Sequence, residues 1–121
     1  MRLGLLIEDS SVIRTVARRI LEDHDFEVVE AADAQKGLDL CRQRMPDLII
    51  VDWKTGELPG AAFVRALRAI SGGSMPKVVS CTTENDADLT ARALSVGADF
   101  HILKPFDRDV IEEMLEALKL S

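Results

Sequence analysis

Charged and hydroxyl side chains stand directly after several short apolar segments of this sequence. The acidic pair Glu8 and Asp9, then Asp52, Thr82 and Lys104, each follow such a segment. If these segments are parallel strands of one sheet, their carboxyl ends meet at the edge where open α/β sheets place their ligands. We therefore expect carboxylates, hydroxyl groups and one ammonium group to converge at that edge.

The carboxylates of this set would repel one another unless a cation lay between them. Each close pair costs roughly 4 kcal/mol at a separation of ~4 Å and an effective dielectric constant of about 20. Oxygen ligands at an open, hydrated edge suit Mg²⁺, which uses one or two carboxylates and keeps several waters. We therefore predict a Mg²⁺ site at Glu8, Asp9 and Asp52, with Asp9 and Asp52 favoured as direct ligands.

Each of these acids also has a simpler interpretation when it is considered alone. Asp9 could cap the first helix, and Glu8 could be a solvated charge at the end of a strand. The conjunction of acidic, hydroxyl and ammonium residues at the ends of several strands favours a functional site over these separate interpretations.

Five apolar segments recur along the chain, and each is followed by a segment with helical periodicity. Two of them, Leu3–Ile7 and Leu48–Val51, are apolar at successive positions, as expected for strands that helices bury on both faces. We therefore predict an α/β fold with a doubly wound, five-stranded parallel sheet. The five predicted strands are Leu3–Ile7, Phe26–Glu30, Leu48–Asp52, Lys77–Cys81 and Asp99–Leu103.

Possible helix ends in the sequence agree with this alternation of strands and helices. Asp33, Asn85 and Asp107 are suitable N-cap residues, Pro46 follows one predicted helix, and Gly97 suits the left-handed position that ends another. The predicted helices therefore have plausible starts and stops between the strands.

The composition restricts the class of protein. With 121 residues, of which 47% are hydrophobic, the chain can build one core, and we expect a single domain over residues 1–121 without an output domain. No apolar run approaches the roughly 18 residues of a membrane span, which predicts a cytoplasmic protein. The net charge of −6 makes DNA an improbable partner. We expect Cys41 and Cys81 to be reduced, apolar core residues.

The order of these motifs resembles the response-regulator receiver family over essentially the whole chain. The resemblance rests on the acidic pair Glu8-Asp9, on Asp52 after Leu48–Val51, on Thr82, and on Lys104-Pro105-Phe106. It implies a flavodoxin-like fold of five strand–helix units. It also implies that Asp52 accepts a phosphoryl group from a histidine kinase or a phosphotransfer protein with the help of Mg²⁺, and that the peptide between Lys104 and Pro105 is cis.

The resemblance implies further roles for two residues and one face. Lys104 would neutralise phosphoryl charge, and Thr82 would bind the phosphoryl group and shift an equilibrium between inactive and active forms. Output would come from a protein-binding face made of residues 85–96, the fifth strand and residues 107–118. We therefore expect a signalling switch of the two-component, chemotaxis or phosphorelay type, and not a metabolic enzyme.

Several residues depart from the family pattern. Glu8 replaces an aspartate, Thr83 replaces a very small residue, and His101 stands where the family has a switching aromatic residue. Lys54 could reach the phosphoryl group or could be an exposed lysine without effect. The loop from Trp53 to Gly60 lacks the usual proline and contains Gly56, so we expect it to be flexible. These departures leave open an alternative, a degenerate receiver that binds a partner without phosphorylation.

Overall fold

The computed structural model describes residues 1–54 and 58–121, and five strands alternate with five helices in these ranges. All five strands lie within one residue of the predicted bounds. The strands are β1 Arg2–Ile7, β2 Phe26–Ala31, β3 Leu48–Asp52, β4 Lys77–Thr82 and β5 Phe100–Leu103. The helices are α1 Ser11–Asp23, α2 Ala34–Gln43, α3 Gly60–Ala69, α4 Ala87–Ser95 and α5 Arg108–Ala117.

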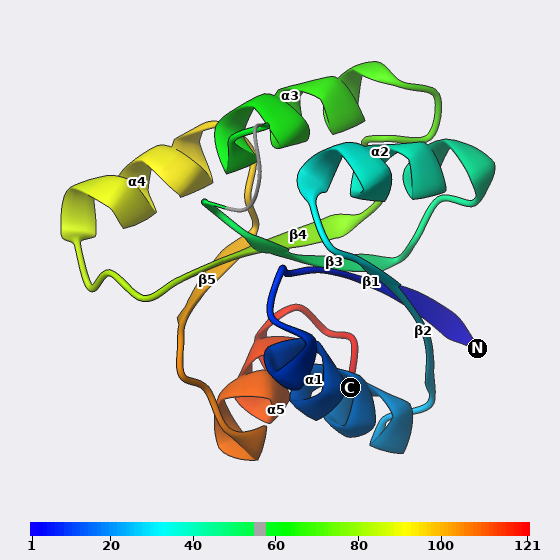
Figure 1. Cartoon of the computed structure of the whole chain (residues 1–121), viewed down its shortest axis with the longest axis vertical. Coiled ribbons are helices and arrows are strands. Elements are labelled where there is room, and N and C mark those ends of the chain that lie inside the picture. The colour runs from blue at the N-terminus through cyan, green and yellow to red at the C-terminus, as the bar shows by residue number, and fades with distance from the viewer. Residues whose placement is uncertain (55–57) are drawn as a thin grey trace.

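The strands form one parallel sheet in the order β2-β1-β3-β4-β5 (Figure 1). The strand order reverses at β1, which pairs with β2 on one side and with β3 on the other. Crossover helices on opposite faces then diverge above the carboxyl ends of β1 and β3, where doubly wound sheets open a crevice. The fold class predicted from the sequence is confirmed.

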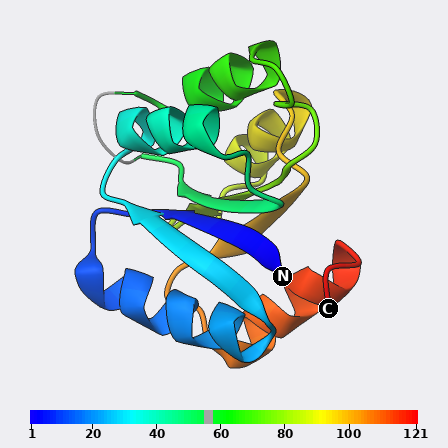
Figure 2. The same cartoon turned by 90° about the vertical axis from the view of Figure 1, so that its right-hand side faces the viewer.

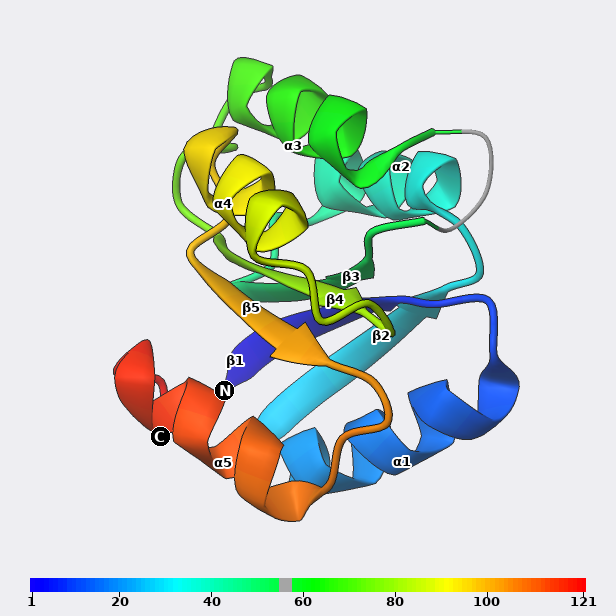
Figure 3. The same ribbon diagram turned by 90° about the vertical axis from the view of Figure 1, so that its left-hand side faces the viewer.

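Two layers of helices cover the sheet. Helices α1 and α5 lie side by side on one face, and α2, α3 and α4 cover the other (Figures 1 and 3). In the side view the sheet runs between the two layers (Figure 2). Each face has its own core cluster, with Phe63 and Leu67 buried on the α2–α3 side and Ile111 and Met114 buried on the α1–α5 side. Strands β1 and β3 are therefore buried on both faces, which explains their almost unbroken apolar sequences.

Aspartates cap three of the helices. The carboxylates of Asp33 and Asp107 accept hydrogen bonds from the first turns of α2 and α5, as predicted. The prediction of Asn85 as the cap of α4 is wrong, since Asp86 accepts bonds from the backbone N–H groups of Asp88 and Leu89. Gly97 has a φ of 119°, the left-handed conformation expected after α4.

Two further expectations from the sequence concern membrane-spanning segments and the loop after β3. Among the described residues, no helix is both long and apolar enough to cross a membrane. The expected flexibility of the loop from Trp53 to Gly60 concerns mainly Thr55, Gly56 and Glu57, and these residues lie outside the described ranges.

Candidate functional site

The carboxyl ends of β1 and β3 bring three acidic side chains together. Val51 pairs with Ile7, so Asp52 at the end of β3 lies beside Glu8, the residue after β1. Glu8, Asp9 and Asp52 each offer a carboxylate oxygen, and these atoms lie within 4.8 Å of one another. Glu8 is buried, Asp52 is half-buried and Asp9 is exposed. The convergence of carboxylates predicted from the sequence is present.

Lys104 supplies the positive charge of the site. Its Nζ atom lies 2.8 Å from Glu8 Oε1 and 3.2 Å from Asp52 Oδ2. Its backbone N–H donates to the carbonyl oxygen of Thr82, and its peptide bond to Pro105 is cis, as the family resemblance implied. The ammonium group therefore contacts both carboxylates from the end of β5, although β5 pairs with neither β1 nor β3.

For both Glu8 and Lys104, burial shifts the pKa in one direction and contacts with oppositely charged groups shift it in the other. Burial raises the pKa of Glu8, and hydrogen bonds from Lys104 and from the backbone of Ser10 offset only part of that effect. Burial alone would lower the pKa of Lys104, but contacts with Glu8 and Asp52 outweigh it and raise the pKa. Lys104 is therefore held as a cation between the two carboxylates.

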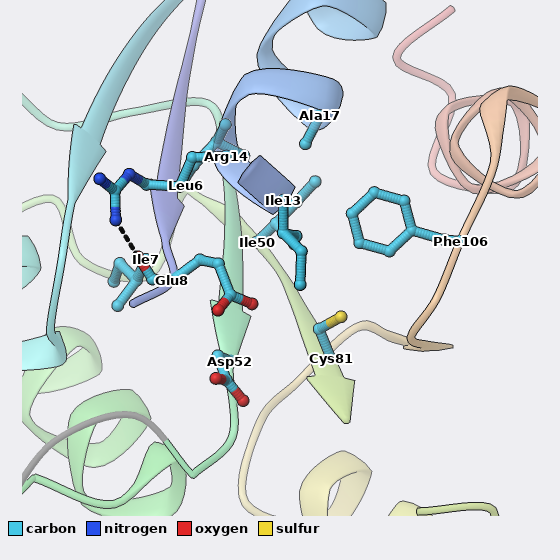
Figure 4. A pocket seen from close by; sticks show the side chains of 10 residues that line it. All are labelled: Leu6, Ile7, Glu8, Ile13, Arg14, Ala17, Ile50, Asp52, Cys81 and Phe106. Carbon is cyan, nitrogen blue, oxygen red and sulfur yellow. Dashed lines mark hydrogen bonds between the residues drawn. The ribbon is translucent and has the colours of Figure 1, made fainter. Parts of the chain in front are cut away.

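The space behind the carboxylates is narrow and mostly apolar. Figure 4 shows Glu8 and Asp52 facing one another, with Ile13, Cys81 and Phe106 further along the same cavity. Its volume of about 10 Å³ holds about one water molecule. A phosphoryl group does not fit there, so a ligand must approach from the exposed side, where Asp9 lies.

Helix α1 begins directly beside the acidic pair. The hydroxyl of Ser10 accepts a hydrogen bond from the backbone N–H of Ile13, so Ser10 is the N-cap of α1. This observation rules out the simpler interpretation of Asp9 as the cap and leaves its carboxylate available for the site. Arg14 donates to the backbone carbonyl of Glu8 at 2.5 Å and thereby helps to fix the pair (Figure 4).

The two threonines after β4 have different environments. Thr82 is 2% exposed, and its hydroxyl oxygen accepts a hydrogen bond from the backbone N–H of Glu84 at 3.2 Å. That bond uses the oxygen as an acceptor and leaves the hydroxyl hydrogen able to donate to a phosphoryl oxygen. Thr83 is exposed. Because the family has a very small residue here, we expect the bulk of Thr83 to restrict a hydrolytic water or a phosphatase at the phosphoryl group, and this stays a prediction.

His101 lies on β5 directly opposite Ser80 of β4. The Ser80 hydroxyl and His101 Nδ1 are 2.6 Å apart, and Nε2 is buried without a hydrogen-bond partner among the described residues. Burial lowers the pKa of His101. Sequence reasoning singled out His101 but missed Ser80, because only the strand register brings the two side chains together.

Sequence reasoning also missed Glu84. The ammonium group of Lys54 contacts its carboxylate, and the backbone N–H of Lys54 lies 3.3 Å from Asp52 Oδ1. A signal was available in principle, since Glu84 follows Thr82 by two residues as Lys54 follows Asp52. This equal spacing is informative only once β3 and β4 are known to be neighbours in the sheet.

The cysteines have no part in this chemistry. Both are buried, and burial raises the pKa of Cys41 to about 11 and that of Cys81 to about 12. Their thiols therefore stay protonated at neutral pH. This agrees with the prediction that they are apolar core residues.

The donor set fits a Mg²⁺ ion. It consists of carboxylate oxygens at a partly hydrated edge, and two oxygens bound to one Mg²⁺ lie at most about 4.2 Å apart. The observed separations of up to 4.8 Å are close to that limit, so small side-chain movements would bring the carboxylates into a coordination shell. Glu8, Asp9 and Asp52 are the residues that would hold the ion.

Comparisons with known proteins agree with the fold. The family model described as "Response regulator receiver domain" matches residues 5–116. The chemotaxis protein CheY of Listeria monocytogenes is 30% identical, with 93% of each chain covered. The PhoB regulator of Escherichia coli is 31% identical, but this chain spans only 50% of its length. The structure of CheY4 of Vibrio cholerae superposes with a TM-score of 0.90, with 29% identity over 97% of this chain and 98% of that one.

Proposed function

We propose that this chain, which belongs to the response regulator receiver family of two-component signalling, is a switch controlled by phosphorylation of Asp52. One observation carries the proposal. Asp52 ends β3 with its carboxylate beside those of Glu8 and Asp9 and 3.2 Å from the Lys104 ammonium group, so acidic oxygens and a cation both surround the acceptor. Phosphoryl transfer depends mainly on such positioning and on neutralisation of charge.

Asp52 would act as the nucleophile. A carboxylate oxygen forms a bond to phosphorus while the bond between phosphorus and the donor nitrogen of a phosphohistidine breaks, and the electron pair of that bond leaves with the imidazole. Glu8, Asp9 and Asp52 would hold Mg²⁺, which supplies charge neutralisation at the phosphoryl oxygens when bound. Lys104 already contacts Asp52 and is placed to neutralise another phosphoryl oxygen.

Thr82 would transmit the effect of phosphorylation at Asp52 to the neighbouring elements. Its hydroxyl hydrogen can donate to a phosphoryl oxygen on Asp52, and Thr82 ends the strand that pairs with β5. A movement of Thr82 would bias the arrangement of α4, β5 and α5, the face that we propose binds a partner protein. A sensor histidine kinase or a phosphotransfer protein would be the phosphodonor.

We further propose that residues 1–121 form a single receiver domain that acts through protein contact. Among the described residues, all five strands belong to one sheet, and the five helices pack on its two faces. The chain also aligns along 93% of a chemotaxis regulator. In this proposal the aspartyl phosphate carries a signal and is not an intermediate in the conversion of a metabolite.

Fluorescence of Trp53 tests the proposed function. Trp53 is the only tryptophan, follows Asp52 directly and is 8% exposed, so its emission should report events at the site. We expect a saturable change with Mg²⁺ and a second change with beryllofluoride or acetyl phosphate. In Asp52→Ala the second change should be absent, and mass spectrometry should find phosphate only on the unsubstituted protein.

A different result would favour the degenerate receiver. If acetyl phosphate adds no phosphate to the unsubstituted protein in the presence of Mg²⁺, the proposed switch is wrong. A partner that bound wild type and Asp52→Ala equally well would then point to a binding module that works without phosphorylation.

A further inference from the structure

The peptide group that joins Glu8 to Asp9 is held by a side chain outside the acidic cluster. Glu8 follows the last paired residue of β1, and its carbonyl oxygen accepts a hydrogen bond from Arg14 Nη1 at 2.5 Å (Figure 4). On its other side, the backbone N–H of Glu8 donates to the carbonyl oxygen of Ala31 at 3.0 Å. The directions in which the Glu8 and Asp9 side chains leave the chain therefore depend in part on Arg14.

Glu30 holds the guanidinium group of Arg14 in place. It lies on β2 and shares a face of the sheet with Phe26 and Val28, which pack toward α1 and α5. Arg14 Nε donates to Glu30 Oε1 at 2.9 Å, while Arg14 Nη1 donates to the Glu8 carbonyl. Two N–H groups of one planar, rigid guanidinium therefore bridge β2 and the loop after β1.

This bridge is less exposed than an ordinary surface ion pair. The side chains of Arg14 and Glu30 are 19% and 28% exposed, and water and salt screen partly buried pairs less than exposed ones. Glu30 also accepts a hydrogen bond from Arg18 Nη1 at 2.6 Å. The hydrogen bonds from Arg18 and Arg14 outweigh burial and lower the pKa of Glu30, so its side chain is a carboxylate at neutral pH.

We propose that Arg14, braced by Glu30, is a positioning residue of the Mg²⁺ site. This inference rests on the proposed function, which places the ion at Glu8, Asp9 and Asp52. Arg14 acts without touching the ion, because its bond fixes the plane of the peptide between Glu8 and Asp9, and that plane sets the relative directions of the two carboxylates. Without this bond the peptide can turn, and part of the binding free energy of the ion is spent on ordering the two acids.

The sign of the effect separates positioning from simple electrostatics. The Arg14 guanidinium is positively charged, and a positive charge beside a cation site opposes the binding of Mg²⁺. If Arg14 acted only through its charge, its removal would strengthen Mg²⁺ binding. If Arg14 orients the acidic pair, its removal weakens Mg²⁺ binding despite the gain in charge balance.

Titration of Mg²⁺ against wild type, Arg14→Gln, Arg14→Lys and Arg18→Gln tests the inference, with binding followed by Trp53 emission and by calorimetry. We expect Arg14→Gln to raise the dissociation constant at least about tenfold, the low end of the range for residues that orient metal ligands. Arg14→Lys should also raise it, because an ammonium group lacks the planar fork that reaches Glu30 and Glu8 together. Arg18→Gln removes the same charge and a contact with Glu30 but leaves the bond from Arg14 to Glu8 in place, so its dissociation constant should stay near that of wild type.

A second pair of variants tests the role of Glu30. If Glu30 acts by bracing Arg14, Glu30→Ala weakens Mg²⁺ binding clearly in the wild-type background and much less in the Arg14→Gln background. An equal effect in both backgrounds would mean that Glu30 acts through its own charge, and the brace would be wrong.

The outcomes distinguish the positioning role from the metal site itself. Circular dichroism and urea denaturation establish that each variant is folded, and if Arg14→Gln is not, Arg14→Lys carries the test. If wild type binds Mg²⁺ and the folded Arg14 variants bind it equally well or more tightly, the positioning role alone is wrong. If wild type shows no saturable response to Mg²⁺ in either measurement, both the metal site of the proposed function and its positioning residue are overturned.

Discussion

In the absence of a metal ion, we expect the loss of Lys104 to destabilise the folded chain more than the loss of any other residue of the site. It is the cation that contacts both Glu8 and Asp52, and all three side chains are largely buried. Removal of one partner from a buried ion pair leaves uncompensated charge. We expect Lys104→Met to lower the free energy of unfolding by about 3 kcal/mol without Mg²⁺, the low end of the range for buried pairs. Urea denaturation measures this loss.

Mg²⁺ should partly replace the missing ammonium group. The loss in Lys104→Met is therefore expected to be smaller at saturating Mg²⁺ than in its absence. Arg108 provides a control, because its ion pair with Asp23 is about half exposed, and Arg108→Met should cost less than about 1 kcal/mol regardless of Mg²⁺. An Mg²⁺-independent loss in Lys104→Met would argue against the proposed placement of the ion.

His101 should make stability depend on pH. Burial lowers its pKa in the folded chain, so the unfolded chain binds more protons below its ordinary pKa of about 6.5. Its contribution to stability is fully present above that value and is lost as the pH falls toward the lowered folded pKa. Protonation would also add a buried N–H donor at the ring, whose Nε2 has no partner among the described residues.

His101→Phe removes this titration and provides the measurement. We expect the free energy of unfolding of wild type to fall more steeply between pH 7.5 and 5 than that of the variant, a window placed around the ordinary histidine pKa of about 6.5. His24, the other histidine of the sequence, is unchanged between the two proteins and does not affect the comparison. Parallel pH curves for the two proteins would contradict the lowered pKa of His101.

At the scale of elements, Gly60 fixes the approach of α3 to the acceptor loop. It is the first residue of α3, and its backbone N–H donates to the Trp53 carbonyl at 3.1 Å. A Cβ atom at this position would overlap the indole ring of Trp53. Alanine in a helix is intrinsically favoured over glycine by about 1 kcal/mol, so the overlap and the helix propensity act in opposite directions.

We expect the overlap to dominate in Gly60→Ala. Overpacking costs about 1 to 3 kcal/mol, so the free energy of unfolding should fall and Trp53 emission should shift as the ring is displaced. Gly4→Ala is the control, because a Cβ atom there makes ordinary contacts of 3.4 and 3.5 Å with Phe26 and Leu21. A Gly60→Ala protein more stable than wild type would mean that α3 is free to move away.

The elements were predictable from the sequence to different degrees. Strands β1 and β3 were found within one residue because a strand buried on both faces is a continuous apolar run. The cap of α4 was misplaced, because Asn85 and Asp86 are both good caps and only the backbone geometry selects Asp86. The positions of Glu8, Asp52 and Lys104 were predictable, since each residue directly follows or ends a strand.

Contacts between neighbouring strands, and between the loops that follow them, were not predictable. The pairs Lys54 with Glu84 and Ser80 with His101 join residues that are 30 and 21 positions apart. They form because β4 lies between β3 and β5, and the chain order alone does not show which strands are neighbours in the sheet. Sequence reasoning therefore identified single residues of the site and missed the partners that set their charge and orientation.

At the scale of the whole molecule, the net charge is negative, and three carboxylates lie close together at the carboxyl edge of the sheet. The chain has 21 acidic and 15 basic residues, and three of the acids converge beside β1 and β3. A cation that binds the folded chain and not the unfolded one stabilises it by RT ln(1 + [L]/Kd). The free energy of unfolding should therefore rise by about 1.4 kcal/mol for each tenfold increase of Mg²⁺ above its dissociation constant.

Screening of the net charge of −6 could also stabilise the chain, so the two effects must be separated. Screening depends on ionic strength, whereas site binding depends on the ion and on its ligands. We expect NaCl at matched ionic strength to give little stabilisation, and Asp9→Asn to move the Mg²⁺ response to higher concentrations. Asp9 is the suitable probe because it is exposed and its loss should disturb the fold least. Equal stabilisation by both salts, unchanged in Asp9→Asn, would mean that Mg²⁺ acts on the overall charge and not at the acidic cluster.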